Sequence, residues 1–160
     1  MIWYLLPCKA QEEQTILNSC KRNLSNAAAR DVFVLTYDQM RRFQGAWHVE
    51  KKLLFPANVL LESENEDILR GEMARQGNGG ILRLEPEEEN FLRFLCGKDK
   101  HIKMSRGVIV KGVTRVIEGP LRGMEAQIRK IDRHKRLASV EAPAGQRMIP
   151  AGLEIVEKSV

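Results

Sequence analysis

The sequence is poor in the residues that mark several common classes of protein. Its 160 residues include only three cysteines, an odd number spaced far apart, which suits reduced, mostly buried thiols better than a disulfide framework. No apolar run approaches the roughly eighteen residues that a membrane span needs, and the chain begins without a basic leader. We therefore expect a cytoplasmic protein with no membrane partner.

Patterns typical of catalysis and cofactor binding are also scarce. The three histidines lie near no cysteine at metal-ligand spacing, and the chain has no glycine motif that would cradle a phosphate. The acidic cluster at residues 85–89 is explained as the start of a helix, where negative charge complements the helix dipole. We expect no metal, no cofactor and no enzymatic activity.

Charge, in contrast, is present in excess and is unevenly distributed. The formal net charge is +5, but residues 1–97 carry 12 Lys and Arg against 14 Asp and Glu, whereas residues 98–160 carry 14 against 7. A basic segment joined to a slightly acidic one usually indicates a polyanionic partner for the basic part. Nucleic acid is the first candidate.

The first part of the chain alternates between strand and helix patterns. Residues 3–6 and 31–37 have the aromatic and β-branched content of buried strands, and residues 10–24 have the apolar spacing of an amphipathic helix. Then follow a strand after a break at Pro56, a helix that starts near Ser63, a short strand at residues 81–84, and a helix from Pro86 to Gly97. The expected order is β-α-β-β-α-β-α.

The last part of the chain has a different pattern. Residues 98–106 are polar and basic, which is typical of a linker. Beyond them, short strand patterns are separated by Gly or Pro turns, without helical periodicity, and together they favour a small barrel. We expect an α+β monomer with domains at residues 1–97 and 107–160. The expected strands of the second domain are residues 108–110, 114–117, 126–131, 137–140 and 153–156.

Positive charge is densest between Arg122 and Arg136, where six basic residues face only two acids, Glu125 and Asp132. Alternation along the strand at residues 126–131 puts Ile128 inward but Ile131 on the opposite face, which predicts a bulge near Lys130. The following residues form a hairpin loop in which Asp132 is the turn former. The basic side chains are then expected to surround one end of the barrel.

Two interpretations of this charge are open. A solvated hairpin that only keeps the domain soluble is the simpler one, although such surfaces usually mix both signs. Arginine outnumbers lysine in this segment, and its planar fork suits phosphates and guanine edges. We favour binding of RNA. The candidate RNA-binding residues are Lys111, Arg115, Arg122, Arg129, Lys130, Arg133, His134, Lys135 and Arg136.

Three segments together resemble a known family. Residues 3–9 (WYLLPCK), residues 53–61 (LLFPANVLL) and residues 119–136, which begin GPLRG, resemble in order the opening strand, the LFPxYV strand and the KOW motif of NusG-family transcription elongation factors. The resemblance implies an N-terminal domain with an antiparallel sheet flanked by helices, which docks on the clamp helices of RNA polymerase. It also implies a C-terminal KOW domain with an SH3-like β-barrel, which recruits a second partner.

The resemblance also implies which residues contact the polymerase. Phe55 and Pro56 match the family's Phe-Pro, and an aromatic held by a rigid backbone offers large contact area at small entropic cost. A core position for Phe55 is the alternative. Trp3 and Tyr4 match an aromatic pair, but alternation sends them to opposite faces of the strand, so at most one can reach a partner. The candidate polymerase-binding residues are Tyr4, Pro7, Leu54, Phe55, Pro56 and Asn58.

Departures from the family pattern narrow the expected function. Asn58 stands where the family usually has an aromatic, Pro7 where specialised members often have Tyr, and Ala126 where the KOW consensus has Gly. The loop at residues 141–147 (EAPAGQR) lacks the aromatic that contacts Rho or ribosomal protein S10. The chain thus resembles a specialised paralogue of the LoaP type, a processive antiterminator that recognises a nascent leader RNA hairpin. The alternative is a general factor that couples polymerase to S10 or Rho.

Overall fold

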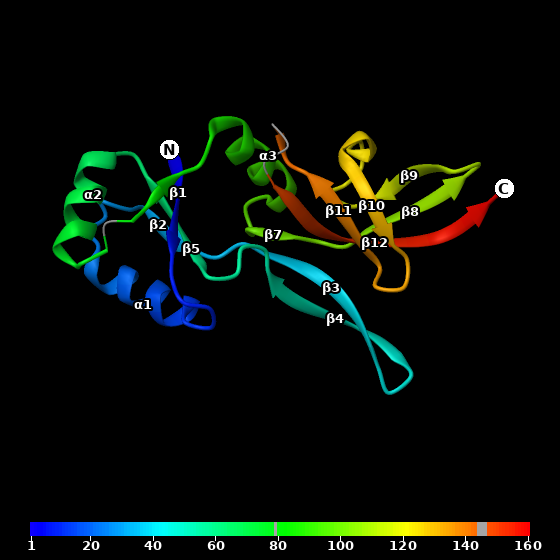
Figure 1. Cartoon of the computed structure of the whole chain (residues 1–160), viewed down its shortest axis with the longest axis horizontal. Helices are drawn as coiled ribbons and strands as arrows, with labels where there is room; N and C mark the ends of the chain where they lie inside the picture. The colour runs from blue at the N-terminus through cyan, green and yellow to red at the C-terminus, as the bar shows by residue number, and fades with distance from the viewer. Residues whose placement is uncertain (79, 144–146) are drawn as a thin grey trace. The chain divides into compact units, whose positions relative to one another are not determined.

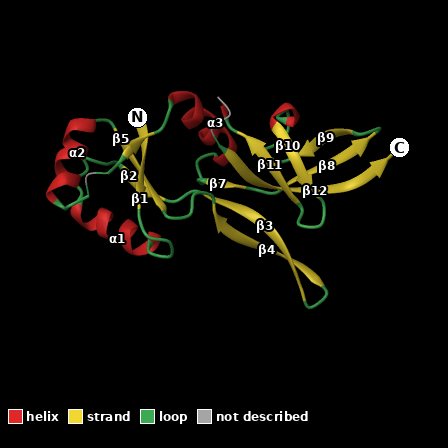
Figure 2. Cartoon of the chain, viewed as in Figure 1, coloured by secondary structure: helices red, strands yellow, loops and turns green. Residues whose placement is uncertain are grey.

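The computed structural model describes residues 1–78, 80–143 and 147–160, and in these the fold is of the expected α+β class. Figures 1 and 2 show the helices and strands along the chain. Two predictions fall partly outside the described residues: the turn at residues 77–80, which includes residue 79, and the loop at residues 141–147, which includes residues 144–146. The chain folds as two compact units, which differ from the expected domains: residues 1–35 with 55–89, and residues 36–54 with 90–160.

The first unit contains an antiparallel sheet with the strand order β2-β5-β1-β6. The first strand, β1 (Ile2–Pro7), lies between β5 (Asn58–Ser63) and the short β6 (Leu82–Arg83), and β2 (Asp31–Phe33) pairs with the other edge of β5. The expected break at Pro56, followed by a buried strand, is confirmed.

Two helices, α1 (Glu13–Asn23) and α2 (Glu66–Arg75), pack against this sheet (Figure 1). Tyr4 and Leu6 of β1 belong to the same core cluster as Leu17, Leu69 and Met73 of the helices. On the other face of β1, Trp3 packs edge-on against Phe33, with ring centroids 5.1 Å apart. Both aromatic residues of β1 are therefore buried, one on each face of the sheet.

A third helix, α3 (Pro86–Cys96), occupies the expected residues and is followed by Gly97, whose φ of +61° suits the end of a helix. Leu92 and Leu95 are buried, whereas Phe94 is 68% exposed. Burial also raises the pKa of the Cys96 thiol to about 12, so this cysteine is unreactive at neutral pH.

The second unit begins with a hairpin that the sequence did not predict. Strands β3 (Thr36–Phe43) and β4 (Ala46–Leu53) pair over their whole length and are joined by two residues, Gln44 and Gly45, both with positive φ. Two left-handed residues in a two-residue loop match the right-handed twist of a hairpin. The expected strand at residues 31–37 is therefore two strands, because β2 ends at Phe33 and β3 begins at Thr36.

The expected linker at residues 98–106 contains ordered strands of the second unit. The short strand β7 (His101–Ile102) runs parallel to β3, and β8 (Ser105–Val110) begins three residues later. His101 is buried, and its ring nitrogens lie 2.7 Å from Thr36 Oγ1 and 2.7 Å from Asp38 Oδ1. These contacts fasten the segment to the β3–β4 hairpin, so it does not behave as a free linker.

A five-stranded sheet follows, with the order β10-β11-β12-β8-β9. It consists of β8 and four further strands: β9 (Val113–Glu118), β10 (Ile128–Asp132), β11 (Leu137–Glu141) and β12 (Met148–Ser159). The first half of β12 pairs antiparallel with β11 and its second half pairs parallel with β8. No β9–β10 pairing closes this sheet into a barrel within the described residues.

The hairpin and the five-stranded sheet approach each other closely at Gly152. A Cβ at this position would meet the Met104 sulfur and would lie 2.7 Å from the Asp38 carbonyl oxygen. The absence of a side chain therefore allows β3 to lie against β12. The two sheets of the second unit form one packed body.

Candidate functional site

The turn at residues 55–58, the Phe55 turn, carries most of the predicted polymerase-binding residues of the first unit. It connects to the end of β1, because Pro7 and Asn58 are directly opposite each other in the β1–β5 ladder and Cys8 N donates to the Ala57 carbonyl at 2.9 Å. Ala57 has a φ of +64°, an unusual conformation for a residue with a side chain. Tight local bonding therefore fixes the path of the backbone through this turn.

Glu13, in the first turn of α1, holds the Phe55 turn in place. Its carboxylate accepts a hydrogen bond from Ala57 N at 2.7 Å, and this bond is the main cause of a pKa below the usual value for glutamate. The Asn58 amide closes the turn by donating to the Pro56 carbonyl at 3.1 Å. A charged acceptor bonded to a backbone N–H is a strong restraint, so Phe55 and Pro56 are presented on a rigid support.

The structure separates the six predicted polymerase-binding residues by exposure. Pro7 and Pro56 are exposed, and Phe55 and Asn58 are half-buried, so these four can offer surface to a partner. Tyr4 is only 1% exposed, and its hydroxyl donates to Glu66 at 2.9 Å. Leu54 is 5% exposed. Tyr4 and Leu54 are core residues, because each fills apolar interior.

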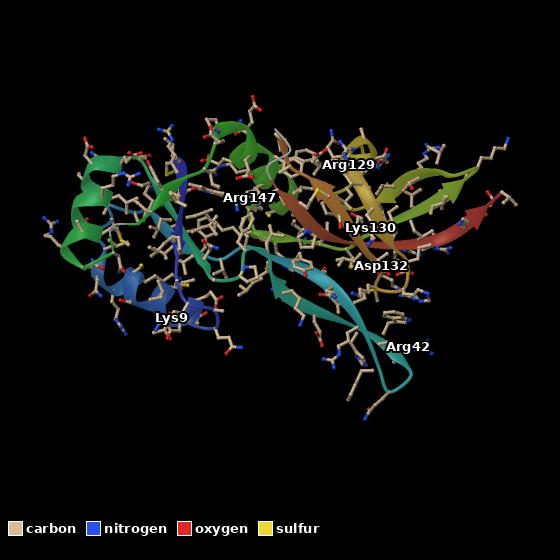
Figure 3. The ribbon with its side chains drawn as sticks, viewed as in Figure 1. Lys9, Arg42, Arg129, Lys130, Asp132 and Arg147 are labelled. Atoms are coloured by element: carbon tan, nitrogen blue, oxygen red, sulfur yellow. The ribbon has the colours of Figure 1, made fainter. Side chains whose placement is uncertain are left out.

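In the second unit, the predicted basic segment contains the expected bulge. The β10–β11 register shifts between Ile128 and Lys130, which places Arg129 at the irregularity. The Arg129 guanidinium donates to the Ala126 carbonyl and to Glu141, with 2.7 Å between Nε and Oε2. Figure 3 shows Arg129, Lys130 and Asp132 following one another along β10. Arg129 is thus partly neutralised, whereas Lys130 is exposed with no ion pair in the described residues.

The loop at residues 133–136, here the β10–β11 loop, has the expected turn. Asp132 Oδ1 accepts from Lys135 N at 3.0 Å, and this backbone bond is the main reason for the lowered pKa of Asp132. Arg133, His134 and Lys135 are exposed, and across the described part of the chain none of them has an ion pair. The loop therefore presents basic side chains to solvent from an ordered backbone.

Arg136, the last residue of this loop, is bound to other side chains. Its guanidinium carbon lies 3.9 Å from the centroid of the Trp47 ring on β4, and Nη1 is 3.4 Å from Glu154 Oε2. Stacking on an aromatic face and pairing with a carboxylate both restrict the guanidinium. Arg136 therefore joins the β10–β11 loop to the β3–β4 hairpin. Sequence reasoning missed Trp47, although Gly45 followed by an aromatic was a signal for a hairpin.

The remaining predicted residues lie elsewhere in the unit, so the nine do not surround one end of a barrel. Val110, just before Lys111, pairs with Ser159, whereas Leu137, just after Arg136, pairs with Gly152. These positions are seven residues apart along β12, or roughly 23 Å at about 3.3 Å per residue. Lys111, Arg115 and Arg122 are exposed, and Lys111 lies at the end of the sheet away from the β10–β11 loop.

A groove of about 400 Å³ lies beside the β10–β11 loop, with the hairpin as its other wall. Two of its basic residues are neutralised, because Arg41 and Lys52 both pair with Glu50, at 3.5 Å and 3.4 Å. The full lining is Gln39, Met40, Arg41, Arg42, Trp47, Glu50, Lys52, His134 and Lys135. This groove is lined by basic side chains and lies directly beside the predicted basic loop, and we treat it as the candidate site.

Comparisons with protein-family models and with curated proteins find no match to this chain. Across residues 1–78, 80–143 and 147–160, no helix is long and apolar enough to cross a membrane, and no group of three or more His, Cys, Asp or Glu side chains is placed to hold a metal ion.

Proposed function

We propose that the chain is a transcription elongation factor of the processive antitermination type, a binding protein rather than an enzyme. In this proposal the first unit docks on RNA polymerase through Phe55, Pro56, Pro7 and Asn58. The five-stranded sheet serves as a KOW module with an SH3-like arrangement, and it binds a hairpin in the nascent RNA.

The observation that carries the proposal is the β10–β11 loop. Arg133 and Lys135 are exposed on an ordered backbone and have no ion pair in the described residues, so they can offer positive charge to a polyanion, with the exposed His134 between them. A loop that only confers solubility needs no fixed turn, whereas a binding loop gains affinity when its conformation is set in advance. RNA is the polyanion to which such a factor has access during transcription.

The Phe55 turn supports the polymerase contact. Interface hot spots are aromatic side chains held rigidly within an otherwise weak contact surface. Phe55 is half-buried beside the exposed Pro56, and the bond from Ala57 to Glu13 holds their backbone. A partner with an apolar surface suits this rigid feature.

The polymerase contact is tested with Phe55→Ala in the full chain. We expect at least tenfold weaker binding to purified RNA polymerase, since loss of a hot-spot aromatic costs about 1.4 kcal/mol or more. Phe94→Ala is the control, because Phe94 is likewise a phenylalanine with solvent-exposed surface but lies on α3. Unchanged polymerase affinity for Phe55→Ala would reject the docking site, and a loss for Phe94→Ala would place the contact on α3.

The RNA contact is tested with the double variant Arg133→Ala, Lys135→Ala. RNA that copurifies with the full chain is sequenced, and its hairpins are used in binding assays. We expect the double variant to bind these hairpins more weakly and with a smaller dependence on salt, because two phosphate contacts are lost. Retention of full hairpin affinity would refute the RNA role.

A further inference from the structure

The β3–β4 hairpin has two faces with different charge. Residues directly opposite each other in an antiparallel ladder share a face. Arg42 is opposite Trp47, whereas Arg41 is opposite His48 and therefore points to the other side. Arg136 stacks on Trp47, so the face that carries Arg42 is the one turned toward the β10–β11 loop.

Arg42 and Arg41 are adjacent but differ in their electrostatic state. Arg41 pairs with Glu50 at 3.5 Å, on a face where Glu50 also neutralises Lys52. Arg42 is exposed and has no ion pair among the described side chains. Figure 3 shows Arg42 extending from the hairpin. The available charge of the hairpin is therefore concentrated on the wall of the groove that faces the loop.

We propose that the groove is a composite RNA site in which the β3–β4 hairpin is the second wall. Arg42 binds phosphates from one side while Lys135 binds them from the other, and Arg136 on Trp47 fixes the spacing of the two walls. This inference rests on the proposed RNA-binding function. It adds Arg42 and Trp47, which precede the β10–β11 loop by more than eighty positions in the sequence.

The geometry favours the backbone of a folded RNA over the bases of a single strand. Binding of single strands depends on aromatic faces onto which bases stack. Here Arg136 already covers a face of Trp47, and the groove lining contains no other Phe, Trp or Tyr. Basic side chains on two facing walls, Arg42 on one and Lys135 on the other, instead suit the phosphates and sugar hydroxyls of a duplex stem.

The test uses the full chain and an RNA hairpin with a stem of about sixteen base pairs, the length that a compact duplex-RNA module spans. We expect Arg42→Ala to weaken binding about threefold to tenfold and to lower the slope of log K against log salt by about one, as for loss of one phosphate contact. Arg22→Ala, at an exposed arginine of α1 that does not line the groove, should change neither quantity. Circular dichroism melting confirms that both variants are folded.

The double variant Arg133→Ala, Lys135→Ala is measured in parallel so that the two proposals can fail separately. If it weakens binding while Arg42→Ala does not, the hairpin wall is excluded and the loop keeps its role. If neither variant weakens binding, both proposals fail. Equal losses for Arg22→Ala and Arg42→Ala, or equal affinity for a DNA duplex of the same sequence, would mean general attraction between charges and would overturn the composite site.

Discussion

At the scale of single residues, Glu13 shows how a distant side chain determines the geometry of a proposed contact. It belongs to α1, yet its carboxylate accepts the Ala57 N–H and so fixes the turn that presents Phe55. Ala57 adopts a positive φ, which costs about 1 kcal/mol for a residue with a Cβ. A bond between a charged acceptor and the N–H of that same residue opposes the strain.

This arrangement predicts a pH dependence. The folded pKa of Glu13 lies below its unfolded value of about 4.3, so the ionised carboxylate stabilises the fold above that pH, and the contribution is lost as pH falls through the lower folded pKa. We expect the free energy of unfolding of Glu13→Gln to fall less steeply with decreasing pH in that acidic range than that of the wild type. Urea denaturation at a series of pH values measures this free energy. Glu12→Gln, at a residue whose side chain makes no capping bond, should retain the wild-type slope.

At the scale of elements, the turn that begins at Gly119 requires a glycine at that position. Gly119 has a φ of +100°, and a Cβ there would lie 2.5 Å from Ser105 Cα and 2.7 Å from the Met104 carbonyl oxygen. The same turn is fastened by Leu121 N, which donates to the buried Ser105 hydroxyl at 3.0 Å. The backbone of the turn therefore packs directly on the start of β8.

Gly119→Ala is expected to lower the free energy of unfolding by at least about 2 kcal/mol, because backbone strain and a clash with main-chain atoms act together. Gly112→Ala is the control: Gly112 has a φ of +78°, but a Cβ added there would meet no atom within 4 Å, so only the strain of about 1 kcal/mol applies. Thermal unfolding followed by circular dichroism compares the two variants. Equal losses would show that the close packing at Gly119 has no energetic effect.

The elements also show what the sequence could reveal. Buried strands such as β1 and β5 were predictable, because a strand that is buried in the core needs a run of apolar residues, and such a run is visible in the sequence. The β3–β4 hairpin is mostly solvent-exposed on its residues from Arg41 to Val49, so it lacks an apolar pattern. The bulge at Arg129 and the Asp132 turn were predictable because they depend on local alternation and local hydrogen bonds.

For the candidate site, sequence reasoning found one wall of the groove and missed the other. Arg133 and Lys135 stand in a charge run that is visible in the sequence. Arg42 and Trp47 do not belong to such a charge run. Only the packing of β3 on β12 at Gly152 brings their hairpin beside the β10–β11 loop. Contacts between residues so far apart depend on tertiary packing, which no local pattern records.

At the scale of the whole molecule, the two units carry two proposed binding functions on one chain. Linked sites raise the local concentration of the second partner once the first is bound, and overall affinity can rise by about 10² to 10⁴ without new contacts. We expect the chain to bind a transcription complex that displays its RNA hairpin at least about a hundredfold more tightly than it binds the polymerase or the hairpin alone.

The measurement is the affinity for stalled complexes with and without the hairpin. The Arg133→Ala, Lys135→Ala double variant should abolish the difference between the two complexes and retain the affinity for polymerase. Phe55→Ala should lower the affinity for the complex with the hairpin to that for the hairpin alone. Independent, additive losses in the two variants would show that the units act separately.

The topology of β12 has a consequence for how the second unit is made. This strand alone joins β11 to β8, and it is synthesised after every strand that it pairs with. During synthesis on the ribosome, the earlier strands can pair only as separate hairpins, and the β3–β4 hairpin with Arg42 and Trp47 cannot yet pack against β12. The proposed groove between the hairpin and the β10–β11 loop thus depends on β12, the last strand that the ribosome delivers.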